Sequence, residues 1–144
     1  MARTQPAMHR FLMIAAIAGA TLATAAFAQL KQPPPGEGHR ANPSEIPFLP
    51  KFCWSQYMDV KGPEYEIRGC GPYMNHYCWG LTELLRARKV SGNPQDKIGY
   101  LVRAKANTLS TLNDMKNYPA CPIRQHAEST LRTVDLQLRA LGAK

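Results

Sequence analysis

The sequence predicts an all-α fold: a small three-helix domain stapled by disulfides, in which an antiparallel helical hairpin and a third helix follow an extended Pro-rich arm. Three observations predict this fold. Apolar residues recur at helical spacing from residue 74 onward, four cysteines follow a leader-like N-terminus, and prolines cluster between residues 29 and 50. The length of 144 residues suits one small domain. We therefore expect a signal peptide at 1–28, an arm at 29–50 and one helical domain at 51–144.

Residues 1–28 have the three-part pattern of a secretory signal peptide. A basic start over residues 1–10 precedes an uncharged apolar run over residues 11–27, which closes with Ala26-Phe27-Ala28, two small residues on either side of a large one. We expect cleavage between Ala28 and Gln29. A membrane anchor is the alternative, but the run is shorter than the roughly 20 residues that span a bilayer. The mature chain is therefore expected to have no transmembrane span and to reside in the periplasm or outside the cell.

The arm at 29–50 holds six of the twelve prolines. Proline fixes φ and lacks an N–H donor, which favours extended, polyproline-like backbone over a helix or a central strand. Residues 46–50 form an apolar extended segment that either packs on its own domain or docks into a partner, and the first is preferred.

Residues 52–78 hold three of the four cysteines and several turn residues. Trp54, Tyr57 and Met58 lie at i, i+3 and i+4, which predicts one face of a short helix. Residues 64–68 alternate polar and apolar side chains, a pattern typical of a short strand or an extended loop.

Three amphipathic helices are predicted after residue 73. The first covers residues 74–89, the second opens with Asn93 as N-cap and Pro94 at the first helical position, and the third begins at Pro122. Pro119 ends the second helix. Their apolar stripes comprise Tyr77, Leu81, Leu84 and Leu85; Ile98, Leu101, Val102, Leu109, Leu112 and Met115; and Ile123, Ala127, Leu131, Val134, Leu138 and Leu141.

Short links make these helices antiparallel neighbours. Helix lengths, short turns and the residues Gly80, Ala104, Ala106 and Pro119 give residues 73–141 a resemblance to a tetratricopeptide-type helical hairpin with a capping helix. The resemblance implies a docking surface. Lys105 interrupts the second stripe, and we expect it to extend past its neighbours at the edge of that face; the alternative is a contact with a carboxylate of another chain.

Four cysteines in an exported domain predict two disulfides. Antiparallel packing favours Cys78 with Cys121, which leaves Cys53 with Cys70. The alternative joins Cys53 with Cys78 and Cys70 with Cys121. A free Cys121 at a helix start would be a reactive thiol, but the chain has no Cys-x-x-Cys pair.

Copper binding is the main alternative to a purely structural role for the soft side chains. Met58, Met74, His76 and His126 are its candidate ligands, with His76 and His126 expected near each other at the cysteine end. Residues at i and i+2 of a helix point apart, and disulfide formation would remove the thiolates. We therefore expect no metal and no cofactor.

Enzyme signatures are missing from the sequence: it has no nucleophile elbow, phosphate loop, dinucleotide fingerprint or H-E-x-x-H. The net charge is +8, but the basic residues are scattered and no nucleic-acid-binding motif occurs. We expect a non-enzymatic binding or scaffolding component of an envelope or extracellular assembly, with a copper-handling protein, a thiol oxidoreductase or a small hydrolase as alternatives. The predicted contact residues are Trp54, Tyr57, Tyr73 and Trp79. Alternatively, these aromatics form core over the disulfides.

Overall fold

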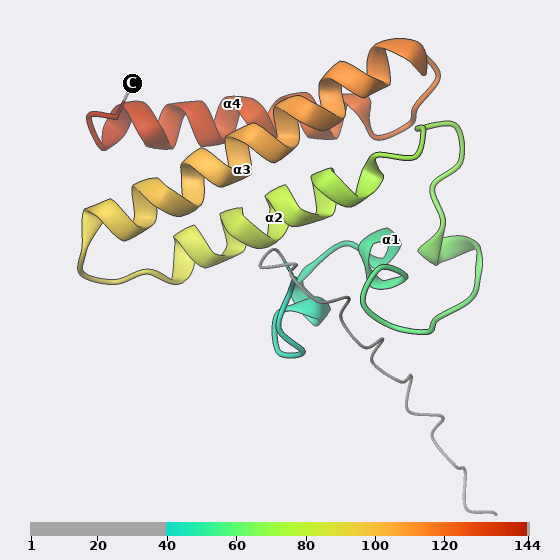
Figure 1. Ribbon diagram of the computed structural model, residues 1–144, viewed down its shortest axis with the longest axis horizontal. Coiled ribbons are helices and arrows are strands. Elements are labelled where there is room, and N and C mark those ends of the chain that lie inside the picture. The colour runs from blue at the N-terminus through green and yellow to red at the C-terminus, as the bar shows by residue number, and fades with distance from the viewer. Residues whose placement is uncertain (1–39, 144) are drawn as a thin grey trace, which may run out of the picture.

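The computed structural model describes residues 40–143, so the expected leader at 1–28 and the first part of the arm lie outside the described residues. The described part is helical, with four α-helices and no strand. A one-turn helix, α1 (Lys51–Trp54), precedes three long helices, α2 (Met74–Lys89), α3 (Pro94–Asp114) and α4 (Arg124–Ala140) (Figure 1). Over the same residues, no helix combines the length and the apolar character that a membrane crossing requires.

The helix α3 packs against both α2 and α4 and runs antiparallel to each of them (Figure 1). The predicted start of α3 is confirmed: the Asn93 side chain accepts a hydrogen bond from the Gln95 amide at 3.0 Å. Gly80 allows α2 to approach α3 closely, because an added Cβ would lie 3.2 Å from the Ala104 carbonyl oxygen. The hairpin expected from the sequence is therefore present. Gly80 allows its two helices to pack closely, and the Asn93 cap fixes the start of the second one.

The ends of the later helices differ by a few residues from the predicted ones. The α-helical part of α3 ends at Asp114 and tightens into a 3₁₀ turn, Met115–Asn117, before Pro119. Helix α4 begins at Arg124, two residues after the predicted Pro122. Lys105 forms an ion pair with Asp135 of α4, Nζ to Oδ1 2.8 Å, so its carboxylate partner belongs to the same chain.

The apolar core divides between two ends of the molecule. At the end where α2 turns into α3, buried side chains of all three long helices meet, namely Leu84, Ala87, Leu101, Ala104, Val134 and Leu138. At the other end, two clusters surround the disulfides and include Ile46, Leu49, Tyr57, Tyr77, Met115 and Ala127.

Residues 46–50 are not an extended segment. The structure forms a 3₁₀ turn over Ile46–Phe48, because Pro47, with its fixed φ, suits the start of a helical turn. Ile46 and Leu49 are buried while Phe48 is 69% exposed. The segment therefore packs on its own domain, as preferred, and presents one phenyl ring outward.

The region between α1 and α2 also differs from the prediction. Helix α1 ends at Trp54, so Tyr57 and Met58 lie in the turns that follow it. Residues 63–65 form a 3₁₀ turn and residues 66–68 an irregular segment in which Glu66 is extended, so of the two alternatives predicted for residues 64–68 the strand is wrong. Long-range contacts determine the conformation of this region, since α1 is held to α2 by a disulfide.

The preferred disulfide pairing is wrong. The structure joins Cys53 to Cys78, with Cα atoms 5.6 Å apart, and Cys70 to Cys121, with Cα atoms 4.6 Å apart. Cys78 lies within α2 and faces α1, whereas Cys70 precedes α2 and reaches the link between α3 and α4. Gly71 permits this approach: it has φ +79°, and the Tyr118 ring occupies the space a Cβ would fill. Cys121 is therefore bonded, not a free thiol.

Candidate docking groove

The segment before α1 is held on α2 by buried charges. Arg86 donates to both Glu45 carboxylate oxygens at 3.0 Å and to the Arg40 carbonyl at 2.7 Å. Glu83, 1% exposed, pairs with Arg86 at 3.4 Å and with Arg103 at 2.9 Å. Paired in this way, both carboxylates are buried without being left as isolated charges.

Electrostatics of Glu45 favour its ionised form. Burial raises the pKa of this carboxyl, but hydrogen bonds from Arg86 and the Asn42 amide and the positive charges of Arg86 and Lys89 outweigh it. The pKa of Glu45 therefore falls below its ordinary value. The carboxylate stays charged at neutral pH and keeps residues 40–49 attached to α2.

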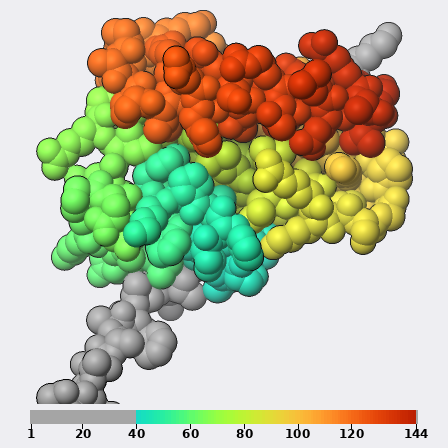
Figure 2. Space-filling model, turned by 180° about the vertical axis from the view of Figure 1, so that it is seen from behind, coloured from blue at the N-terminus to red at the C-terminus, as the bar shows by residue number. Residues whose placement is uncertain are grey.

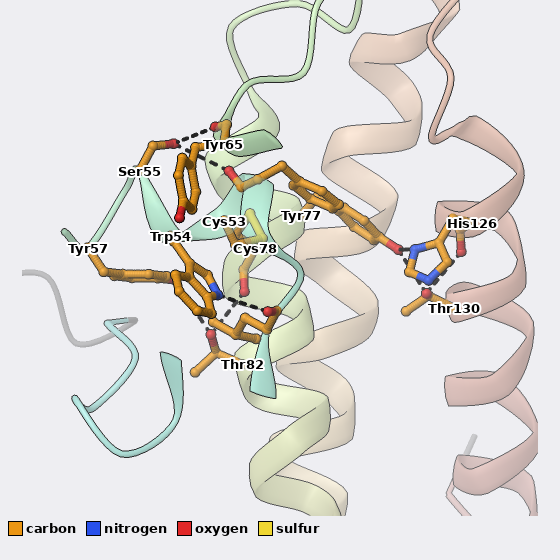
Figure 3. Close-up of a disulfide and its surroundings, with 12 residues drawn as sticks. Cys53, Trp54, Ser55, Tyr57, Tyr65, Tyr77, Cys78, Thr82, His126 and Thr130 are labelled. Carbon is orange, nitrogen blue, oxygen red and sulfur yellow. Dashed lines mark hydrogen bonds between the residues drawn. A yellow bond between two sulfur atoms is a disulfide. The ribbon is translucent and has the colours of Figure 1, made fainter. Parts of the chain in front are cut away.

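Between α2 and α4, Tyr77 connects the two helices by hydrogen bonds (Figure 3). Its hydroxyl lies 2.9 Å from Thr130 Oγ1 and also contacts His126 Nδ1. Thr130 donates its own proton to the His126 carbonyl at 2.9 Å, so Tyr77 donates to Thr130 and accepts from His126 Nδ1–H. This leaves Nε2 as the open nitrogen of His126. Burial raises the pKa of Tyr77 to about 12.

A cavity of about 220 Å³ lies beside this connection, between α2, α4 and the Ile46–Phe48 turn. Six of its nine lining residues are apolar, and the lining comes from three separate parts of the chain. The lining residues are Phe48, Leu49, Pro50, Leu81, Leu84, Leu85, Arg88, His126 and Thr130. We call this cavity and its rim the docking groove. Figure 2 shows the chain around residues 40–58 lying against α2 and below α4.

The rim of the docking groove is basic. Arg88 and Lys89 are exposed on the last turn of α2, and Lys89 Nζ lies 5.4 Å from the centre of the Phe48 ring. Within residues 40–143, Arg88 forms no ion pair, and the nearby acids Glu45 and Glu83 are occupied by Arg86 and Arg103. The groove therefore combines a lining of mostly apolar residues with the Arg88 guanidinium, which has no carboxylate partner in the described chain.

The four predicted contact aromatics do not form one exposed patch. Tyr57 is 4% exposed and belongs to the core near Cys53–Cys78, which corrects its assignment to an exposed surface. Trp54 is half-buried and donates its indole N–H to the Leu49 carbonyl at 2.9 Å (Figure 3). On α2, half-buried Trp79 stacks edge-on with His76, whose ring adjoins Tyr73. Of the four, only Tyr73 is largely exposed, at 51%.

The candidate copper ligands are distributed over different contacts. His76 Nδ1 donates to the Asn107 side-chain oxygen at 3.2 Å, whereas His126 contacts Tyr77. Met58 packs with the cluster around Cys53, and Met74 packs with the cluster around Cys70. Among the described residues, no three His, Cys, Asp or Glu side chains gather as a metal site.

The docking groove was not predicted from the sequence. Leu81, Leu85 and Arg88 lie at i, i+4 and i+7 of α2, a spacing that marks one helix face. The sequence assigned the two leucines to the core, and only the position of Phe48 beside them shows an accessible cavity. Comparison with protein-family models, curated proteins and solved structures finds no match for the chain.

Proposed function

We propose that this chain is an exported, non-enzymatic binding protein that docks a segment of another protein in its groove, in the periplasm or outside the cell. The observation that supports it most is an open cavity of about 220 Å³ whose lining residues are mostly apolar and include a largely exposed phenylalanine, Phe48. Pockets for small ligands and cofactors are commonly about 300–1,000 Å³. A smaller, open cavity suits one or two anchoring side chains of a partner protein.

Export is supported by two independent features. Residues 1–28 have the pattern of a cleaved leader, and the two cysteine pairs stand at disulfide distance, as is compatible with an oxidising compartment. The mature chain would then consist of a Pro-rich arm and a three-helix domain. The arm would hold that domain at a distance from the cleavage site.

Preorganisation supports a binding role for the groove. One wall comes from residues 48–50, which precede Cys53 by only a few positions and are tied to α2 through Cys53–Cys78 and Glu45–Arg86. The other wall, on α4, is connected to α2 through Tyr77. A surface held in this way loses little conformational freedom on binding, which favours affinity.

Photo-crosslinking in intact cells tests the proposal. The full-length chain is expressed in its own host with Phe48→p-benzoylphenylalanine, and a matched chain carries the same group at Lys116, an exposed residue outside the groove. We expect a crosslinked protein adduct from position 48 and none from position 116. Equal adducts from both positions, or none from position 48, would contradict a docking role for the groove.

A further inference from the structure

We infer that the segment bound in the docking groove is acidic: a short stretch with an aliphatic or aromatic anchor flanked by Asp or Glu. This inference rests on the proposed function and specifies the chemistry of the partner. It combines three observations on the groove, namely the charges at its rim, the polar groups open inside it, and its length along α2.

Charge is the first observation. The cations Arg88 and Lys89 stand on the last turn of α2, and no carboxylate is among the residues that form the cavity wall. The buried acids Glu45 and Glu83 are already paired with arginines. An acidic segment would supply the missing counter-charge and approach faster for that reason.

The polar groups inside the groove are the second observation. Thr130 donates to the His126 carbonyl and accepts from Tyr77, so both hydroxyls have partners within the domain. Among the residues of the cavity wall, the Arg88 guanidinium is the side-chain donor without a hydrogen-bond partner in the described chain. A guanidinium is the side chain best suited to a carboxylate, because it offers two parallel N–H donors.

Length is the third observation. Leu81, Leu85 and Arg88 cover two helical turns, a distance of about 10 Å along the axis of α2. An extended segment covers that distance with about three residues. The apolar anchor over Leu81 and Leu85 and the acid beside Arg88 are therefore expected within about three positions of each other.

Peptide selection tests the inference without knowledge of the natural partner. A phage-displayed library of random peptides is selected on the oxidised mature protein, and binding of the recovered peptides is measured by fluorescence anisotropy. Arg88→Glu is the test variant. Arg132→Glu is the matched control, because Arg132 is an exposed arginine of α4 that does not form part of the cavity wall.

We expect Asp or Glu to be enriched near a Leu, Ile, Met or Phe in the recovered peptides. Arg88→Glu should lower the affinity for these peptides about tenfold or more, and so should replacement of the peptide's Asp or Glu by Asn or Gln. Arg132→Glu should leave the affinity nearly unchanged. Thermal unfolding of both variants verifies that they fold. Phe48→Ala, at a largely exposed position, provides a second groove variant that should also weaken the peptides.

Other results separate this inference from the proposed function. Peptides that need Phe48 but show no acidic enrichment would overturn the acidic partner and leave the groove as a docking site. Peptides unaffected by Phe48→Ala and Arg88→Glu, or no recovered peptide, would overturn both. A crosslink from position 48 to residues 29–39 or to a second copy, or displacement of the peptides by phosphatidylglycerol vesicles, would assign the groove to a different occupant.

Discussion

The two ends of this domain are held together by different means. Where α2 turns into α3, apolar side chains of three helices interlock around Leu101 and no cysteine takes part. At the opposite end, one-turn helices and loops surround Cys53–Cys78 and Cys70–Cys121. Between the two ends, ion pairs with Arg86 attach residues 40–49 to the side of α2. The comparison indicates that regular helices need only a packed stripe, whereas short irregular segments need covalent bonds and specific polar contacts to stay in place. The docking groove lies where the irregular end meets α2 and α4.

Removal of the disulfides should have the largest effect on this comparison. In the chain-entropy account, bridges with sequence separations of 25 and 51 residues contribute about 3 to 5 kcal/mol each, and the longer loop contributes more. The double variant Cys70→Ala/Cys121→Ala should therefore lose more free energy of unfolding than Cys53→Ala/Cys78→Ala. Urea denaturation measures both, and losses under about 1 kcal/mol would contradict the role assigned to the bridges.

A cavity in the disulfide-free end should destabilise the domain by about 3 kcal/mol. Leu101 is 0% exposed at the centre of that end, and Leu101→Ala removes its packing against α2 and α4. When Leu101→Ala is combined with Cys53→Ala/Cys78→Ala, the two losses in free energy of unfolding, measured by urea denaturation, should add within about 0.5 kcal/mol, because the clusters are separate. Strong non-additivity would mean that the two ends act as one unit.

Loss of Arg86 should free the segment before α1. Arg86→Met leaves the buried Glu45 carboxylate without its ion-pair partner, while Glu83 keeps Arg103, and should cost about 2 to 3 kcal/mol, less than a fully buried pair, because the Arg86 side chain keeps 17% exposure. Hydrogen exchange at residues 45–49 should accelerate more than exchange in α3. An unchanged pattern would show that the ion pairs do not hold this segment.

The same ion pairs predict an acid dependence. The folded-state pKa of Glu45 lies below its unfolded value, so its contribution to stability is present above the ordinary glutamate pKa and is lost as pH falls through the folded pKa. Urea midpoints measured from pH 6 downward should decline less steeply for Glu45→Gln than for the wild type.

The smallest effect is expected at the connection between α2 and α4. Tyr77→Phe removes hydrogen bonds to His126 and Thr130 and should cost about 1 kcal/mol at pH 7. Because folding raises the pKa of Tyr77 from 10.0 to about 12, its contribution is present below pH 10 and is lost as pH rises toward 12. Urea midpoints from pH 9 to 12 should decline less for Tyr77→Phe, and parallel declines would contradict the raised pKa.

Sequence patterns predicted the long helices around Leu101 better than the short segments around the two disulfides. Local signals such as the Asn93 cap and the stripe through Leu101 and Val134 predicted α2, α3 and α4, because helices depend on contacts three and four residues apart. The burial of Tyr57 and Glu83 could not be predicted in this way. Both depend on partners far away in the chain, which are Thr82 for Tyr57 and Arg103 for Glu83.

The disulfide pairing shows the same limit. Proximity of helix ends favoured Cys78 with Cys121, but the direction in which each cysteine faces is decided by the loop at Gly71 and by α1. The docking groove depends on the same loops, since Phe48 reaches Leu81 and Leu85 only after residues 40–54 fold back on α2. The candidate site was therefore less predictable than the helices that carry it.

Disulfide mapping of the mature protein, purified without reductant from its own host, tests the central claim most directly. Proteolysis and mass spectrometry should show Cys53 linked to Cys78 and Cys70 linked to Cys121, in a chain that begins at Gln29. Free thiols, or a link from Cys53 to Cys70, would contradict a stapled, preorganised groove.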